Sequence, residues 1–270
     1  MQTGTPTNNC LILGAGRSGT SLTAVLLKEA GYHVCRYSHP PDEGNPLGYF
    51  EDLEVIKTNE AILGQYHTTW RRISRRVRGK PNIDTTGPWL LDLDHRRLKD
   101  VRLRSDHADK FRDLFARIPF AYKDPRFSFT LRAIAPLIPE DTVYICVFRH
   151  PLPVVESTKK QALRSGLILD DQYCLAVWEA HYRCLLEHYR TLGGQWLFIS
   201  YEQLMDGLAL PRMEEFLNIR LDKTLIQPEL NRTRGYGTQP DKVAQLFEEL
   251  KELSGSTSDK QHADQPIRTA

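Results

Sequence analysis

Residues 14–21, with the sequence GAGRSGTS, combine three glycines with an arginine and three hydroxyl side chains. Gly14, Gly16 and Gly19 have the G-x-G-x-x-G spacing of dinucleotide-binding loops, and the same stretch nearly matches the G-x-x-x-x-G-K-[ST] loop of nucleoside triphosphatases. Both kinds of loop hold phosphate on the backbone N–H groups at the start of a helix. The stretch therefore predicts a phosphate site, and other residues decide which phosphate it holds.

Both of these standard loops lack a residue that their chemistry needs. A dinucleotide site uses an acidic residue about 20 positions later, after the second strand. Here the apolar run His33–Cys35 is followed by Arg36, with no carboxylate before Asp42, so only an NADP enzyme would fit. In the triphosphatase loop a lysine follows the last glycine, and Thr20 takes that position. An NADP oxidoreductase or a nucleotide-dependent small-molecule kinase stays open as a second enzyme class.

The loop carries its own positive charge earlier, at Arg17. After a strand and before a helix, its backbone N–H groups would point outward and meet the positive end of the helix dipole. Such a site suits a single phosphate with an arginine beside it, and the alternative is a tight glycine turn without a ligand. The N–H groups concerned belong to Ser18, Gly19, Thr20 and Ser21.

A second anion site is indicated by the stretch VYICVFRHPLPVVESTKK. Arg149 ends a predicted strand there, and Ser157 lies two turns into the next predicted helix. The planar guanidinium matches phosphate oxygens, and the hydroxyl adds a donor from the next element. The two sites together predict a nucleotide that carries two separated phosphates.

These paired motifs resemble the sulfotransferase family that uses 3′-phosphoadenosine 5′-phosphosulfate (PAPS). Three further stretches resemble its bacterial branch: NPLGYFED at 45–52, KDPR at 123–126 and YEQL at 201–204. The likeness covers most of residues 11–204 and is weakest at 65–117 and beyond 221. It implies a P-loop-like fold, PAPS as co-substrate, 3′,5′-adenosine bisphosphate (PAP) as product, no metal, and transfer of a sulfuryl group to a hydroxyl or amine of a small molecule.

The resemblance also assigns roles to individual residues. The nucleotide-binding set is Gly16, Arg17, Ser18, Gly19, Thr20, Ser21, Arg149, Ser157 and Arg232, the last from a looser match. The catalytic set is Arg17 at the leaving oxygen, Glu51 as general base, and Lys123. The substrate-binding set is Arg126 together with Tyr49 and Phe50, two aromatic residues for which the alternative is a place in the hydrophobic core.

Several of these assignments have alternatives. Glu51 has an equal interpretation as a first-turn carboxylate that stabilises a helix, with His39 and His67 as other candidate bases. Arg126 would instead form a structural ion pair with Asp124.

The elements that must position these residues follow from the apolar pattern. Strands are expected where short, continuous apolar runs occur, as in a parallel sheet covered by helices on both faces: Cys10–Leu13, His33–Cys35, Phe120–Lys123, Val143–Phe148 and Trp196–Ile199. Helices are expected at 18–30, 151–163, from 170 to the glycines at 193–194, and from 240. The fold class is α/β: one domain over 1–254, a helical insertion at about 51–117 that forms an acceptor-binding or lid region, and a disordered tail at 255–270.

The composition limits the class of protein. With 40% hydrophobic and 26% charged residues and a net charge of +2, the chain is typical of a globular domain, and no apolar run is long enough to span a membrane. The start MQTGTPTNN does not resemble a secretory signal, so a cytoplasmic protein is expected. The five cysteines include no C-x-x-C pair, which favours reduced thiols over a zinc site.

One segment is strongly basic. Residues 71–104 carry many arginines against four aspartates, which indicates a solvated face or a site that attracts an anion. An inactive nucleotide-binding module that docks a polyanion is the remaining alternative, and nucleic acid is not the expected partner.

Overall fold

The computed structural model of the protein describes residues 6–38, 48–66, 101–164, 166–227 and 238–255. Within them one sheet has the strand order β2-β1-β3-β4, and every neighbouring pair is parallel. The strands are β1 (Asn9–Leu13), β2 (Ala121–Lys123), β3 (Thr142–Phe148) and β4 (Trp196–Ser200). The α/β class with a central parallel sheet is therefore confirmed.

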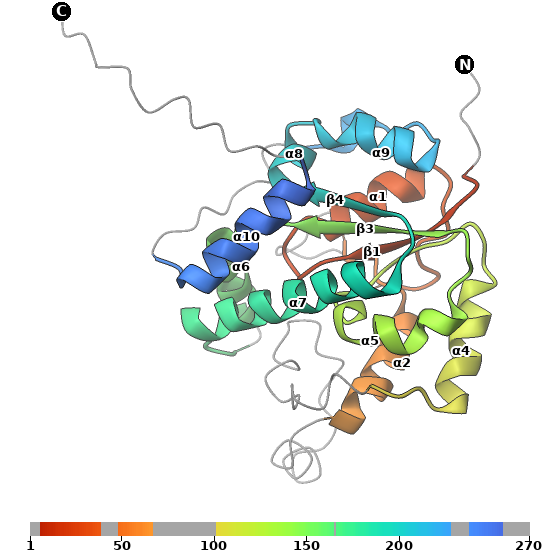
Figure 1. The fold of residues 1–270 in the computed structure, drawn as a ribbon, viewed down its shortest axis with the longest axis horizontal. Coiled ribbons are helices and arrows are strands. Elements are labelled where there is room, and N and C mark those ends of the chain that lie inside the picture. The colour runs from red at the N-terminus through yellow and green to blue at the C-terminus, as the bar shows by residue number, and fades with distance from the viewer. Residues whose placement is uncertain (1–5, 39–47, 67–100, 165, 228–237, 256–270) are drawn as a thin grey trace, which may run out of the picture.

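Helices cover both faces of this sheet (Figure 1). The α-helices are α1 (Thr20–Glu29), α2 (Leu53–Leu63), α4 (Ser105–Phe115), α5 (Phe127–Ile134), α6 (Pro151–Arg164), α7 (Asp171–Leu192), α8 (Tyr201–Met205), α9 (Ala209–Leu217) and α10 (Asp241–Leu253). Short 3-10 turns occur at η1 (Gly64–Tyr66), η4 (Ala135–Leu137) and η5 (Lys223–Leu225). The helices expected after β1 and β3, before β4 and near the carboxyl end are all present.

The strands separate two hydrophobic cores because side chains alternate between the two faces of a sheet. Cys10 and Ile12 pack on the side of α1, α8 and α9. Leu11 and Leu13 pack on the side of α5 and α7. Every residue of β1 and β3 is buried, which explains why these strands are continuous apolar runs in the sequence.

The expected strand at His33–Cys35 is wrong. His33 forms a single isolated bridge to Phe120, just before β2. The residues after His33 form no ladder with β2, and the backbone N–H of Arg36 donates to the carboxylate of Asp52 at 2.8 Å. Since Arg36 does not end a strand, the NADP interpretation loses the geometry that it needs.

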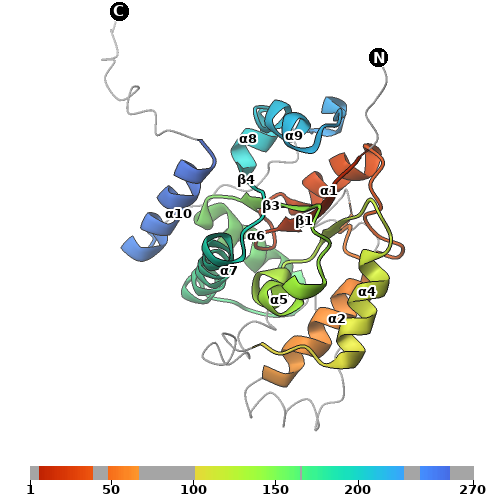
Figure 2. The same ribbon diagram turned by 45° about the vertical axis from the view of Figure 1, so that its right-hand side comes forward.

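Of the expected insertion at 51–117, the structure describes the two ends, residues 51–66 and 101–117. Figure 2 shows α2 and α4 side by side, next to α5. The Asp52 side chain begins α2 by accepting the N–H of Glu54 at 2.8 Å, the N-cap role that favours Asp. The central part, 67–100, with most of the basic segment, lies outside the described residues, as do most of the tail and the late arginine loop.

The order of the strands places a crevice beside β1. The chain passes from β1 to β2 on one side, then crosses back to β3 on the other side. In open parallel sheets ligands bind at such a switch point, beyond the carboxyl ends of the strands. Leu13, Lys123 and Phe148 end the three strands concerned, so the predicted site residues that follow them meet at one edge.

Candidate active site

The loop between β1 and α1 depends on glycine at two positions. Gly14 has φ +143°, and a Cβ atom there would lie 2.2 Å from the Val147 carbonyl oxygen of β3. Gly19, just before α1, has φ +97°, and its Cβ would lie 2.8 Å from the Tyr201 ring. The loop is therefore pressed against its neighbours, and only glycine allows that approach.

Arg17 lies at the crest of this loop in a left-handed conformation, φ +68°, which is uncommon for a residue with a side chain. Its Nε donates a hydrogen bond to Ser157 Oγ in α6 at 2.9 Å. The two predicted anion-binding motifs are 140 positions apart in the chain, and the structure brings them into contact.

Tyr182 of α7 supports the loop from below. Its hydroxyl lies 2.9 Å from Ser18 Oγ and 3.0 Å from the Val147 carbonyl oxygen, and it accepts the Ala15 N–H at 3.3 Å. The side chain is fully buried, and burial raises the pKa of its hydroxyl, so it stays neutral. Sequence analysis missed this residue because nothing near Tyr182 in the chain indicates a contact with the loop.

Replacing Tyr182 by phenylalanine should lower the free energy of unfolding by about 1–3 kcal/mol, because buried polar groups of the loop would lose a partner. Urea unfolding followed by fluorescence measures the change. Tyr189→Phe, at a partly exposed tyrosine of the same helix, is the matched control and should change stability by less than about 0.5 kcal/mol. Equal stability of the two variants would show that Tyr182 does not hold the loop.

Arg149 follows β3 and is buried at the same edge. Its guanidinium lies over the Tyr201 ring, 4.1 Å from the ring centre, and its carbonyl oxygen accepts the indole N–H of Trp178 at 3.1 Å. Burial lowers the pKa of Arg149, and Tyr201 and Glu202 act in the opposite direction. The Arg149 guanidinium is therefore buried beside an aromatic ring at the position where the sequence predicts the second anion site.

Glu51 and Lys123 form a buried ion pair across the crevice. Lys123 Nζ lies 2.5 Å from Glu51 Oε1, and the two side chains are 3% and 6% exposed. The same ammonium lies 3.4 Å from Ser21 Oγ at the start of α1. Sequence analysis selected each residue separately, and the structure places both beside the loop.

Arg126 is fixed by two carboxylates. Its Nη1 lies 3.0 Å from Asp124 and its Nε lies 2.8 Å from Glu60 of α2. Burial alone would lower the pKa of Arg126, but Asp124 and Glu60 outweigh it and the pKa is raised. Asn59 in turn donates to Asp124 at 2.9 Å. The structural ion pair foreseen as an alternative is present, and Arg126 also lines the pocket described next.

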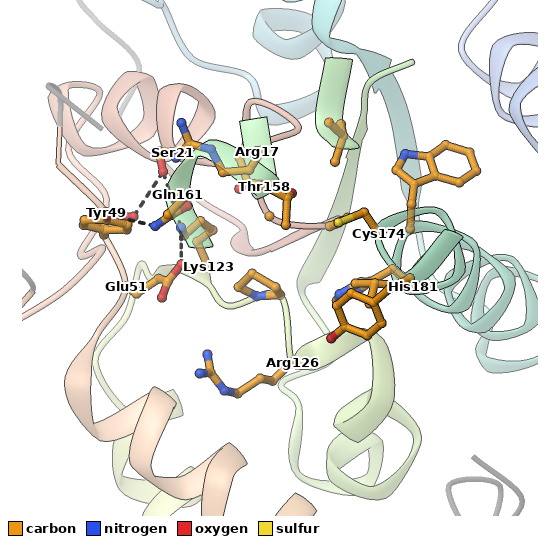
Figure 3. A pocket seen from close by; sticks show the side chains of 18 residues that line it. Arg17, Ser21, Tyr49, Glu51, Lys123, Arg126, Thr158, Gln161, Cys174 and His181 are labelled. Carbon is orange, nitrogen blue, oxygen red and sulfur yellow. Dashed lines mark hydrogen bonds and ion pairs between the residues drawn. The ribbon is translucent and has the colours of Figure 1, made fainter. Parts of the chain in front are cut away.

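One pocket joins part of the predicted set (Figure 3), and its lining does not include Ser18, Gly19, Arg149 or Ser157. Its lining includes Arg17, Thr20, Ser21, Tyr49, Glu51, Lys123 and Arg126 from the predicted set, together with Gly16. Gln161 Nε2 donates to the Tyr49 hydroxyl at 3.1 Å and ties α6 to this corner. Phe50 lies elsewhere: it packs against the core under α1, with Lys28 Nζ 5.6 Å from its ring centre.

Part of the lining was not predicted. It comes from α6, α7 and the turn after β2: Pro125, Val154, Thr158, Gln161, Tyr173, Cys174, Val177, Trp178 and His181. These residues have helical spacing in the sequence and look like ordinary core. His181 is buried with Nδ1 2.9 Å from Ser128 Oγ. The predicted residues Arg232, His39 and His67 lie outside the described residues.

The part of the chain that the structure describes contains neither a candidate metal centre nor a candidate membrane helix. Among the described residues, no group of three or more His, Cys, Asp or Glu side chains could hold a metal ion. No helix in the described ranges is long and apolar enough to cross a membrane.

Comparison with known proteins places the chain among sulfotransferases. The model of the family described as "Sulfotransferase family" matches residues 10–222. The fold is similar to that of the sulfotransferase domain from the Synechococcus PCC 7002 olefin synthase, with TM-score 0.53 and 20% identity over 92% of this chain and 98% of that one.

Two other solved structures are similar to the same extent. The sulfotransferase domain from the curacin biosynthetic pathway has TM-score 0.53 and 16% identity, with 92% of this chain and 99% of that chain covered. Sulfotransferase STF9 from Mycobacterium avium has TM-score 0.51 and 17% identity, with 92% and 77% covered. At these identities the likeness concerns the fold. No curated protein sequence matches this chain.

Proposed function

The chain belongs to the sulfotransferase family, and we propose that it transfers a sulfuryl group from PAPS to a hydroxyl, or alternatively an amine, of a small molecule. The observation that carries the proposal is the 2.9 Å contact between Arg17 and Ser157. It joins the loop after β1 to the helix after β3, and this contact between the two predicted anion-binding motifs supports a nucleotide that carries phosphates at its 3′ and 5′ ends.

The residues present fit this nucleotide. The glycine-rich loop offers the backbone N–H groups of a helix start, with the hydroxyls of Thr20 and Ser21 beside them, and would hold the 5′ end. Arg149, buried to 6% exposure, and Ser157 would hold the 3′-phosphate. When bound, PAPS would supply the activated sulfuryl group.

In the proposed reaction the acceptor oxygen forms a bond to sulfur as the bond from sulfur to the bridging phosphate oxygen breaks. That oxygen takes the electron pair and leaves with the nucleotide as PAP. Arg17 would stabilise the negative charge that grows on it, because a fixed cation interacts more strongly with the transition state than with the ground state.

Glu51 would accept the proton that the acceptor loses. Lys123, held at 2.5 Å, would keep this carboxylate turned to the reacting centre and stabilise the sulfuryl oxygens. The remaining effect is positioning. The sulfuryl group carries less negative charge than a terminal phosphoryl group, so we propose that no metal is needed.

Nucleotide binding gives the direct test. PAP should raise the melting temperature far more than ATP or NADPH at equal concentration, because ligand that binds the native state stabilises it. A greater effect of ATP or NADPH would favour the kinase or the oxidoreductase. Strongly salt-dependent binding of nucleic acid, without PAP binding, would favour the inactive module.

Arg149→Ala should weaken PAP binding by about 10- to 100-fold, the loss expected for a hydrogen bond to a charged group. Isothermal titration calorimetry measures the affinity. Arg190→Ala, at an exposed arginine of α7 paired with Glu249, is the matched control. If PAP affinity were the same in both variants, Arg149 would not bind the 3′-phosphate.

A further inference from the structure

The pocket has two unlike sides. One side carries the glycine-rich loop and the Glu51–Lys123 pair, where the reaction is proposed to occur. The opposite side carries Val154, Tyr173, Cys174, Val177 and Trp178, here called the α6–α7 wall, and His181 of α7 lines the pocket on the same side. Figure 3 shows Cys174 and His181 across the cavity from Tyr49 and Glu51.

Three charged side chains among the described lining residues form ion pairs with other side chains of the protein. Glu51 is paired with Lys123, and Arg126 is paired with Asp124 and Glu60. In the proposed function the positive charge of Arg17 is matched by the 5′ end of the bound PAPS. An acceptor that brought its own carboxylate or ammonium against the wall would bury that charge without a counter-charge among the described residues, which is costly.

The wall itself is apolar in character. Burial raises the pKa of the Cys174 thiol to about 11, so the thiol is neutral and behaves as a small apolar group. The indole N–H of Trp178 is already used by the Arg149 carbonyl oxygen. The polar groups on this side are the Tyr173 hydroxyl and the His181 ring, which is bonded to Ser128 Oγ through Nδ1 at 2.9 Å. A sugar would place more hydroxyls against this surface than these two groups can satisfy.

We propose that the acceptor is an uncharged alcohol or phenol whose apolar body packs on the α6–α7 wall while its hydroxyl faces the Glu51–Lys123 pair. This inference rests on the proposed function and names the substrate class of the same site. The arginine-rich segment, by contrast, had indicated an anionic acceptor. The few uncharged polar groups near the hydroxyl end, Thr158, Gln161 and Tyr49, suit one hydroxyl and its approach.

The acceptor class is tested with PAPS and a panel of simple acceptors, by measuring PAP formation. For 4-alkylphenols kcat/KM should rise about two- to fourfold with each of the first few methylenes, as apolar surface is buried. 4-Hydroxybenzoate should react at least about tenfold more poorly than 4-methylphenol because its carboxylate would be desolvated. Glucose should be poorer still. Sulfation of 4-hydroxybenzoate or glucose as efficiently as the alkylphenols would overturn the inference.

A substitution in the α6–α7 wall gives a second test of the acceptor class. Val177→Asp should lower kcat/KM for 4-pentylphenol at least about tenfold, because the chain would meet a carboxylate. Ala176→Asp, at the exposed neighbour on α7 that lies outside this pocket, is the matched control and should stay within about threefold of the original protein. Equal losses in both variants would show that the wall does not contact the acceptor.

Measuring PAP binding shows whether a negative result contradicts the acceptor class or the proposed function itself. Both variants should keep the thermal shift produced by PAP. If the protein binds PAP but sulfates no alkylphenol, the acceptor class is wrong and the nucleotide site stands. If PAP gives no shift in the original protein, the proposed function itself fails.

Discussion

Arg17→Ala is expected to lower kcat by about 100- to 1000-fold, the loss seen when one preorganised donor to a developing negative charge is removed. Arg17 lies on the loop that would hold the 5′ end of the donor, and its Nε is fixed by Ser157 at 2.9 Å. Its positive charge is therefore oriented before the donor arrives. Single-turnover measurement of PAP formation isolates the chemical step from product release.

The backbone at Arg17 allows a control for stability. Because φ is +68°, glycine fits this position better than any other residue, and Arg17→Gly should be at least as stable as the original protein. It should nevertheless be as inactive as Arg17→Ala, while Arg17→Lys keeps part of the activity. A kcat within about threefold of the original in Arg17→Gly would remove Arg17 from the reaction.

The sheet could be predicted from sequence because its strands are buried on both faces. Cys10–Leu13 and Val143–Phe148 are unbroken apolar runs, and the structure has them within one residue of the expected bounds as β1 and β3. His33–Cys35 has the same composition but forms only a bridge. Just after it, the Arg36 N–H donates to the Asp52 side chain, a contact between residues 16 positions apart that no local pattern indicates.

The candidate site could be predicted where a residue follows a strand or belongs to a motif. Arg17, Lys123 and Arg149 each come directly after an apolar run or a glycine turn, and the structure places them at one edge of the sheet. The supporting residues could not be predicted. Tyr182 contacts the loop from 164 positions away, and its spacing within α7 is that of any core tyrosine.

The α6–α7 wall was missed for the same reason. Cys174 and Val177 occupy the apolar face of a long helix, and their position in the sequence does not distinguish a core from a pocket. Only the packing of α7 against α5 and α6 decides which part of that face borders a cavity. In the proposed function, acceptor specificity would therefore depend on packing, whereas phosphate binding would depend on short motifs.

Glu51→Gln is expected to lower kcat by about 100- to 10,000-fold, the contribution of a positioned general base. Glutamine keeps the shape of the side chain and its hydrogen bond to Lys123, but it cannot accept the acceptor proton. PAP affinity should be unchanged because Glu51 lies on the acceptor side of Lys123. Initial rates with saturating PAPS and saturating acceptor measure kcat in both proteins, and calorimetry with PAP measures the nucleotide affinity.

Glu54 of α2 provides a control that distinguishes a general base at Glu51 from the effect of removing any one negative charge. Glu54 forms a partly exposed ion pair with Arg117 at 2.7 Å, so Glu54→Gln removes one negative charge without touching the pocket and should leave kcat within about threefold. If Glu51→Gln behaved in the same way, the carboxylate would be structural, holding Lys123 in a buried pair. The buried His181, which lines the same pocket, would then be the next base to replace.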